Sequence, residues 1–147
     1  MYRDGPFRGD EVKHLLARAK AIKSQFILVE SIKSGVPRLY NFNNGILGQP
    51  TRGLALKISD REVILVTTNV PEKIGVPRPI RLRIHEDGEQ ASLDQLIETT
   101  LKLTLLHYGS LKDPRLPIPL YASDAIAYRR LQGIYPTNPE GDRQFWL

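Results

Sequence analysis

Hydrophobic residues recur at helical spacing in two long stretches of the chain. In residues 10–23 the apolar positions follow the i, i+3, i+4 rule, with acidic residues at the start and lysines at the end, as the helix dipole favours. The second stretch opens at Ser92, which with Gln95 has the spacing of a capping box. Its apolar positions are Leu93, Leu96, Ile97, Leu101 and Leu105. We predict two amphipathic helices that pack through these apolar stripes.

Shorter apolar runs predict strands between these helices. The predicted strands are residues 26–32, 39–42, 54–58, 62–68 and 80–84. A Ser-Asp-Arg turn joins 54–58 to 62–68 in a hairpin, and 62–68 is apolar on both faces, which is typical of a central strand. In 80–84 arginines alternate with Ile and Leu, so we expect one apolar and one basic face.

A third helix is predicted after the sequence Leu-Pro-Ile-Pro at residues 116–119. The prolines force an extended entry, and helical spacing then places Leu120 and Leu131 on one face. Asp124 falls in the first turns of this helix and Arg129 just over one turn later. Such an element can hold a metal ion and a phosphate together, although the same pattern also fits an ordinary surface helix with solvated charges.

The element order is helix, strand, strand, hairpin, strand, helix, helix, which predicts an α/β fold with a mixed sheet. The 147 residues form one domain or part of one, and 41% hydrophobic content suffices for a core. There is no cysteine, so disulfides and thiolate metal sites are excluded. No apolar run approaches the length of a membrane span, and we expect a soluble cytoplasmic protein without a membrane partner.

Positive charge is concentrated near the start of the chain. The net charge is +5, and residues 1–40 hold eight Lys and Arg against four acidic residues, hence four of the five charges. A basic domain favours a polyanionic partner, most commonly nucleic acid. The candidate phosphate contacts are the turn at Lys33, Ser34 and Gly35, together with Arg38, Arg78, Arg81, Arg83, Arg129 and Arg130.

Two aspartates are candidates for metal chemistry. Asp4 lies where an apparent strand passes into a turn, and Asp124 lies early on the last predicted helix. Carboxylate oxygens are the ligands that Mg²⁺ prefers, and paired metal ions can cleave phosphodiesters. Spacing alone does not bring the two together, and Asp-Gly is also a common turn. The histidines show no metal-ligand spacing, and no P-loop or zinc motif is present.

Five motifs, taken in order, resemble the C-terminal half of the Piwi domain of prokaryotic Argonaute proteins. They are Tyr-Arg-Asp-Gly at residues 2–5, Lys-Ser-Gly with Arg-Leu-Tyr in residues 33–40, Gly-Val-Pro-Arg-Pro at 75–79, the Leu-Pro-Ile-Pro stretch through residue 124, and the apolar C-terminus. The resemblance covers nearly the whole chain. It implies that residues 1–147 are a C-terminal Piwi segment with a partial ribonuclease H-like fold, whose first strands lie upstream.

The resemblance also implies site residues and partners. Asp4 and Asp124 would be the third and fourth members of a four-residue site for Mg²⁺ or Mn²⁺. The carboxylate of Leu147 would bind the metal that holds the 5′-phosphate of a guide strand. Arg129 would lie near that phosphate, and the guide backbone would contact Tyr121, Arg78, Lys33, Ser34 and Arg38. The implied partners are a guide, a target nucleic acid and the upstream remainder of the Argonaute.

One departure from the family pattern bears on activity. The first Asp and the catalytic Glu of the family precede the Arg-Asp-Gly motif, whereas this chain begins two residues before Arg3. Two of four carboxylates do not hold two metal ions in cleavage geometry, so we expect the chain alone not to cut. Two alternatives stay open, namely a guide-binding module without catalysis and an unrelated basic α/β domain that binds a protein.

Overall fold

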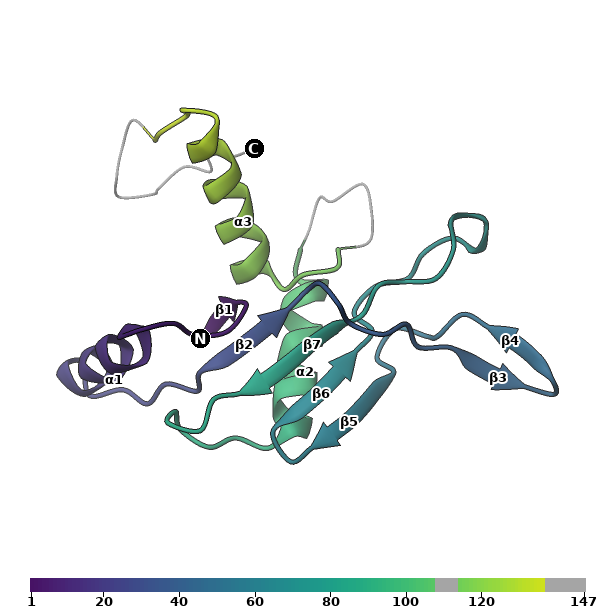
Figure 1. The fold of residues 1–147 in the computed structure, drawn as a ribbon, viewed down its shortest axis with the longest axis horizontal. Coiled ribbons are helices and arrows are strands. Elements are labelled where there is room, and N and C mark those ends of the chain that lie inside the picture. Colours follow the sequence, from purple (N-terminus) through teal and green to yellow (C-terminus); the bar gives the residue numbers. More distant parts are fainter. Residues whose placement is uncertain (108–113, 137–147) are drawn as a thin grey trace.

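Five strands form one mixed sheet in the computed structural model, which describes residues 1–107 and 114–136 (Figure 1). The strand order is β1-β2-β7-β6-β5, in which β1 and β2 are parallel and all other neighbours are antiparallel. A separate hairpin consists of β3 and β4. The elements are β1 Tyr2–Asp4, α1 Glu11–Ala21, β2 Val29–Ile32, β3 Asn41–Asn43, β4 Ile46–Gly48, β5 Ala55–Ser59, β6 Glu62–Leu65, a 3-10 turn Glu72–Ile74, β7 Ile80–Ile84, α2 Leu93–Leu105 and α3 Ile118–Leu131.

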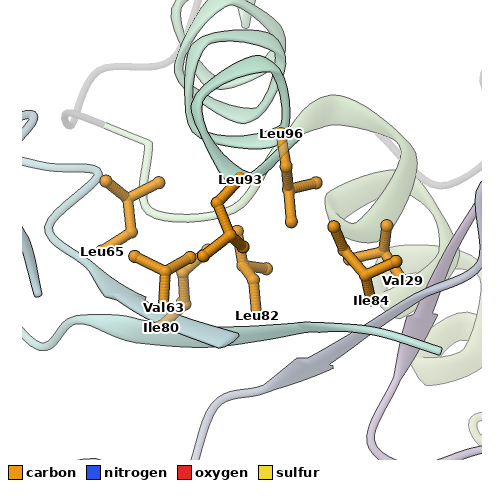
Figure 2. Close-up of a cluster of buried hydrophobic side chains, with 8 residues drawn as sticks. All are labelled: Val29, Val63, Leu65, Ile80, Leu82, Ile84, Leu93 and Leu96. Carbon is orange, nitrogen blue, oxygen red and sulfur yellow. The ribbon is translucent and has the colours of Figure 1, made fainter. Parts of the chain in front are cut away.

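The core lies between the sheet and α2 (Figure 2). The alternation of β7 places Ile80, Leu82 and Ile84 on the side that α2 covers, and their exposed fractions are 2% or less. Leu93 and Leu96 of α2 pack onto them. The helix begins at Ser92 with the predicted capping box, in which Ser92 and Gln95 bond each other's backbone amides. The predicted α/β class, the interior position of β6 between β7 and β5, and the capping box are therefore confirmed.

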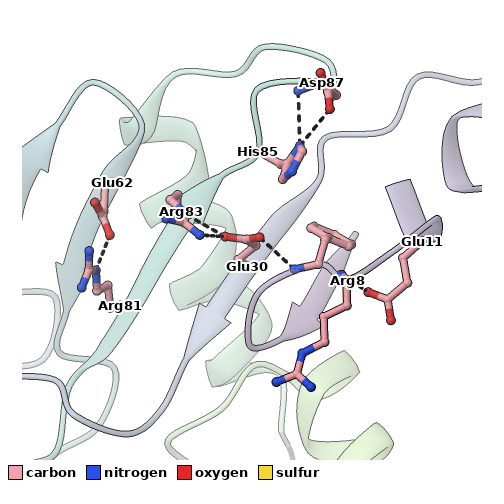
Figure 3. A network of polar contacts seen from close by, with 9 residues as sticks. Arg8, Glu11, Glu30, Glu62, Arg81, Arg83, His85 and Asp87 are labelled. Carbon is pink, nitrogen blue, oxygen red and sulfur yellow. Dashed lines mark hydrogen bonds and ion pairs between the residues drawn. The ribbon is translucent and has the colours of Figure 1, made fainter. Parts of the chain in front are cut away.

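The other face of the sheet carries ion pairs between neighbouring strands (Figure 3). Arg83 of β7 binds the carboxylate of Glu30 on β2, with 2.5 Å between Nη2 and Oε2, and Arg81 binds Glu62 of β6. Glu30 is only 2% exposed, and its second oxygen accepts a hydrogen bond of 2.8 Å from the Phe7 amide. The predicted basic face of β7 exists, but both of its arginines are already paired with acids.

Two apolar stripes differ from the prediction. Ile22, at the end of the stripe of α1, is 58% exposed, and Ala19 is the one buried residue of that helix. On α3, Leu120 is 2% exposed whereas Leu131 is 87% exposed, so these two leucines do not share a buried face. Periodicity identifies an apolar face correctly but does not say whether the described chain covers it.

Strand boundaries also moved. The predicted strand 26–32 is regular only from Val29, because residues 26–28 bond to a turn instead: the amides of His85 and Glu89 donate to the carbonyls of Leu28 and Phe26. The extended stretch at 39–42 becomes β3, whose partner β4 was not predicted, with Asn44 and Gly45 at φ +52° and +80° in the turn between them. Among the described residues, no helix has the length and apolarity needed to cross a membrane.

The turn after β7 has room only for glycine at position 88. A Cβ added to Gly88 would lie 2.9 Å from the Leu28 amide nitrogen and 3.1 Å from the Phe26 carbonyl oxygen. We therefore expect Gly88→Ala to lower the free energy of unfolding by about 1–3 kcal/mol, because backbone atoms must move. Urea denaturation followed by circular dichroism measures this change.

Gly48→Ala is the matched control for that measurement. The nearest atom to its added Cβ is the Asn41 carbonyl oxygen at 3.9 Å, an ordinary contact. This variant should stay within about 0.5 kcal/mol of the unsubstituted chain. Equal stabilities for the two variants would contradict the packing described for the 85–89 turn.

Candidate functional site

Asp4 and Lys33 lie at one edge of the sheet because β1 and β2 run in parallel. Asp4 is the last residue of β1 and pairs in register with Ser31, and Lys33 follows directly after the end of β2. The chain then turns away at Gly5, which has φ +80° and donates its amide to the Ser31 carbonyl at 2.8 Å. The Asp-Gly turn thus leaves the Asp4 carboxylate at the end of the strand, beside the Lys33 side chain.

Helix α3 brings Asp124 to the same edge. Pro117 is its N-cap with extended backbone, as the Pro-x-Pro sequence predicts, and Leu120 anchors its first turn in the interior. The helix packs near β1, and Asp124 lies one turn beyond Leu120. Two acidic residues that are distant in the sequence therefore come from a strand end and a helix to one place.

The Lys33 ammonium joins the two carboxylates. Its Nζ lies 2.8 Å from Oδ2 of Asp4 and 2.5 Å from Oδ2 of Asp124. The two carboxylate oxygens are therefore no further apart than the sum of these distances, 5.3 Å. Partial burial alone would lower the pKa of Lys33, but the hydrogen bonds and charges of Asp124 and Asp4 outweigh it and the pKa is raised.

This arrangement fits part of a site for a hard divalent cation. Two carboxylate oxygens already share one cation, and Mg²⁺ is commonly held by one or two protein carboxylates together with substrate phosphates. Within residues 1–107 and 114–136 no group of three or more His, Cys, Asp or Glu side chains can hold a metal. The described chain thus offers two acidic ligands and no complete cage.

A groove of about 1150 Å³ is lined by three arginines, Arg38, Arg78 and Arg115, the last of which also bonds the Lys33 carbonyl. Burial lowers the pKa of the Arg115 guanidinium, and the positive charges of Arg78 and Arg38 lower it further. In the described part of the chain none of the three forms an ion pair with an acidic residue. The wall also includes Tyr40, which is 47% exposed. Clustered positive charge beside an exposed ring suits a phosphate-bearing ligand.

Arg115 was not predicted as a functional residue, although it links the groove to the carboxylate pair. Its guanidinium donates to the carbonyl oxygen of Lys33 at 2.8 Å, of Arg78 at 3.0 Å and of Pro79 at 3.1 Å. Its own carbonyl accepts a hydrogen bond from the Thr67 hydroxyl at 2.5 Å. No residue-type pattern marks such a role, because every acceptor of the Arg115 guanidinium is a backbone carbonyl.

The remaining predicted residues are dispersed over α3 and the Lys33 turn. Ser34 is exposed in the turn after β2. Tyr121 is 40% exposed, and its ring packs edge-on against His107 with centroids 4.2 Å apart. Arg129 lies in the last turn of α3 beside Gln132. Leu147 lies outside the described residues. These positions leave the predicted nucleic-acid contacts as predictions.

The mixed sheet with its flanking helices defines an α/β protein whose architecture fits a partial ribonuclease H-like fold, and the acidic pair lies at one edge of that sheet. No family model matches the chain. Over all 147 residues it is 31% identical to the protein argonaute of Aquifex aeolicus strain VF5, of which it covers 20%.

Solved structures give the same result. A crystal structure of Aa-Ago with externally bound siRNA matches 99% of this chain and 20% of its own length, with a TM-score of 0.79 and 34% identity. Clostridium butyricum Argonaute bound to a guide DNA and a 19-mer target DNA matches 86% of the chain and 17% of its own length, with a TM-score of 0.72. At 20% identity this second match shows the fold alone.

The resemblance read from the motifs is therefore confirmed, and the chain is homologous along its whole length to a segment of Argonaute. It spans about one fifth of the length of the relatives that it matches. The alternative of an unrelated basic α/β domain does not agree with these matches.

The backbone bonds of Arg115 make it a test of how the site is held together. We expect Arg115→Ala to lower the free energy of unfolding by about 1–3 kcal/mol, because three carbonyls lose a charged donor. Arg78→Ala is the matched control, since Arg78 joins this network through its backbone carbonyl, which alanine keeps. Urea denaturation compares the two. Equal effects of the two substitutions would argue against a bracing role for Arg115.

Proposed function

We propose that the chain is the C-terminal Piwi segment of an Argonaute endonuclease that binds a guide and a target nucleic acid. In this proposal Asp4 and Asp124 supply two of the carboxylates of a site for Mg²⁺ or Mn²⁺, and upstream residues supply the others. The observation that carries the proposal is the convergence of Asp4 and Asp124 on a single ammonium group. This convergence was expected from the resemblance and was not dictated by the spacing.

The metal, when bound, would supply a Lewis acid that activates water and stabilises the charge developing on the phosphate oxygens. The task of this chain is to hold two acidic ligands in fixed relative positions. The end of β1 fixes one of them and α3 fixes the other, and the turn at Gly5 and the buried Leu120 keep both in place. Part of each carboxylate stays accessible, with 45% of the Asp4 side chain and 38% of the Asp124 side chain exposed.

The arginine-lined groove supports the nucleic-acid half of the proposal. A chain of phosphates that lies along Arg38 and Arg78 would also come near the Lys33 turn, because Arg115 in the wall of the groove bonds the backbone carbonyls of both Arg78 and Lys33. Ser34, Tyr121 and Arg129 would add backbone contacts on either side. The Leu147 carboxylate is proposed as a ligand of the metal at the guide 5′-phosphate.

A second function without catalysis is supported by the same groove. In that case the chain would bind a guide through phosphates, and no activity of the assembled protein would depend on the carboxylate pair. The accessible carboxylates favour the endonuclease, since a binding module has no need of paired acidic residues next to a phosphate path. The two functions differ in whether metal is required.

Cleavage tests the catalytic assignment. The chain is combined with the upstream Argonaute segment that its relatives possess, a 5′-phosphorylated guide and a labelled complementary target in Mg²⁺ or Mn²⁺. We expect Asp4→Ala or Asp124→Ala to reduce the cleavage rate to about one hundredth or less, because a metal ligand is lost. Asp94→Ala, which removes an exposed carboxylate that pairs with Lys57, is the control and should cut normally.

The outcome separates the two functions. Cleavage that persists in both aspartate variants would show that the catalytic assignment is wrong. Guide binding without metal-dependent cleavage in the assembled protein would instead support the binding module.

Oligonucleotide binding by the chain tests the groove. Fluorescence anisotropy with a single-stranded 5′-phosphorylated oligonucleotide is measured over a range of salt concentrations. Arg38→Ala/Arg78→Ala is expected to weaken binding about tenfold and to reduce the slope of log K against log salt by about 1.4, or about 0.7 for each lost phosphate contact. Arg18→Ala/Arg61→Ala removes the same charge from exposed sites in α1 and the β5–β6 turn. A similar loss in both double variants would mean that the groove has no special role.

A further inference from the structure

The Lys33 ammonium lies between the two carboxylates, where a metal ion bound by both of them would otherwise lie. Its ammonium lies 2.8 Å from Asp4 and 2.5 Å from Asp124, so both acids are bound to one positive charge. A divalent ion in contact with the same oxygens would lie next to this ammonium, and two cations at that distance repel each other. Lys33 and a metal ion therefore exclude each other from the Asp4–Asp124 pair.

The position of the Lys33 backbone does not depend on the ion pairs of its side chain. The Arg115 guanidinium bonds the Lys33 carbonyl at 2.8 Å, which fixes the turn after β2. The Lys33 side chain is 24% exposed, and its ammonium is a compact charge at the end of a flexible four-carbon stem. The ammonium can thus leave the carboxylates without any change in the fold of the turn.

A second anionic partner would be available to Lys33 when nucleic acid is bound. Arg115 lines the groove together with Arg38 and Arg78, and its guanidinium also bonds the backbone carbonyl of Lys33, so the Lys33 turn is the next segment beyond Arg115. A phosphodiester held there would offer oxygens to the ammonium in exchange for the two carboxylates. With the Lys33 ammonium bound, the two carboxylates and the ammonium together carry one negative charge. When the ammonium moves away, the two carboxylates carry two negative charges.

From these contacts we propose that Lys33 is a resident cation that keeps metal off the Asp4–Asp124 pair until a nucleic-acid phosphate draws its ammonium away. This inference rests on the proposed function of the site and adds a coupling to it: metal binds more tightly in the presence of nucleic acid. By linkage, nucleic acid also binds more tightly in the presence of metal.

The first experiment measures Mn²⁺ binding to the full chain by electron paramagnetic resonance, which reports free Mn²⁺ without any need for activity. Lys33→Met keeps the stem and removes the charge, and is expected to tighten Mn²⁺ binding about tenfold or more, since a unit charge near a divalent ion has at least this effect. Lys57→Met is the matched control, because Lys57 pairs with a single exposed carboxylate, Asp94, at 2.8 Å. It should leave the affinity unchanged.

Two further variants distinguish failure of this inference from failure of the proposed site. Asp4→Asn/Lys33→Met should lose the gain in Mn²⁺ affinity. If Lys33→Met has the circular dichroism of the unsubstituted chain but no gain in affinity, while Asp4→Asn weakens binding, the metal site stands and the role of Lys33 is wrong. If neither substitution changes Mn²⁺ binding, both the site and the inference are wrong.

The second experiment tests the coupling. Mn²⁺ binding is measured with and without a single-stranded oligonucleotide, and Mn²⁺ held by the DNA itself is subtracted with the Asp4→Asn/Asp124→Asn variant. We expect the oligonucleotide to increase the Mn²⁺ affinity of the unsubstituted chain about fivefold or more. In Lys33→Met the increase should be absent. An equal increase in both chains would overturn the coupling.

Discussion

The parallel pairing of β1 with β2 is the constraint on which the candidate site depends. Parallel neighbours present their carboxyl ends at the same sheet edge, so Asp4 and the residues after Ile32 must meet there. An antiparallel β1 would place Asp4 at the opposite end of β2, far from Lys33. Only three residue pairs form this ladder, and the bonds of Gly5 to Ser31 and of Phe7 to Glu30 extend it beyond the strand.

The rest of the molecule holds that edge in position. The apolar side of β7 and β6 packs against α2, and this contact forms the hydrophobic core. Arg115 then joins three segments, namely the turn after β2, the loop before β7 and the approach to α3. A single guanidinium thereby connects the arginine-lined groove to the backbone of Lys33, whose side chain binds the acidic pair. Geometry of this kind is suited to a polymeric ligand, whose charges repeat at fixed spacing.

Much of the sheet and of α2 could be predicted because their signals are local. Alternation marks β7, the two-sided apolarity of residues 62–68 marks the central strand, and the Ser92 cap marks the start of α2. The exposure of Ile22 and Leu131 could not be predicted, since periodicity does not state which partner, if any, covers a face. The predicted basic face of β7 is paired with Glu30 and Glu62, which depends on strand register and not on composition.

The site was predictable only in part. The two aspartates were recognised through motif resemblance, because nothing in their separation along the chain requires them to meet. Lys33 was expected at a nucleic-acid backbone, whereas in the structure it binds both carboxylates. Arg115 was missed altogether. The nucleic-acid contact predicted for Lys33 stays a prediction. Neither its bonds to the two carboxylates nor the role of Arg115 could be read from the sequence, because the fold determines the partner of a long cationic side chain and the residue type specifies only its charge.

The arginine–glutamate ion pairs on the face of the sheet opposite α2 have an electrostatic consequence. The charges in each pair neutralise each other, so these pairs add no net charge to that face of the sheet: Arg81 with Glu62, and Arg83 with Glu30. Arg38, Arg78 and Arg115, which form no ion pair with an acidic residue in the described part of the chain, then leave a local concentration of positive charge in the groove. Positive charge that is not neutralised attracts an anion before contact, so such a groove would raise the rate of association with an anionic ligand in a way that falls with rising salt concentration.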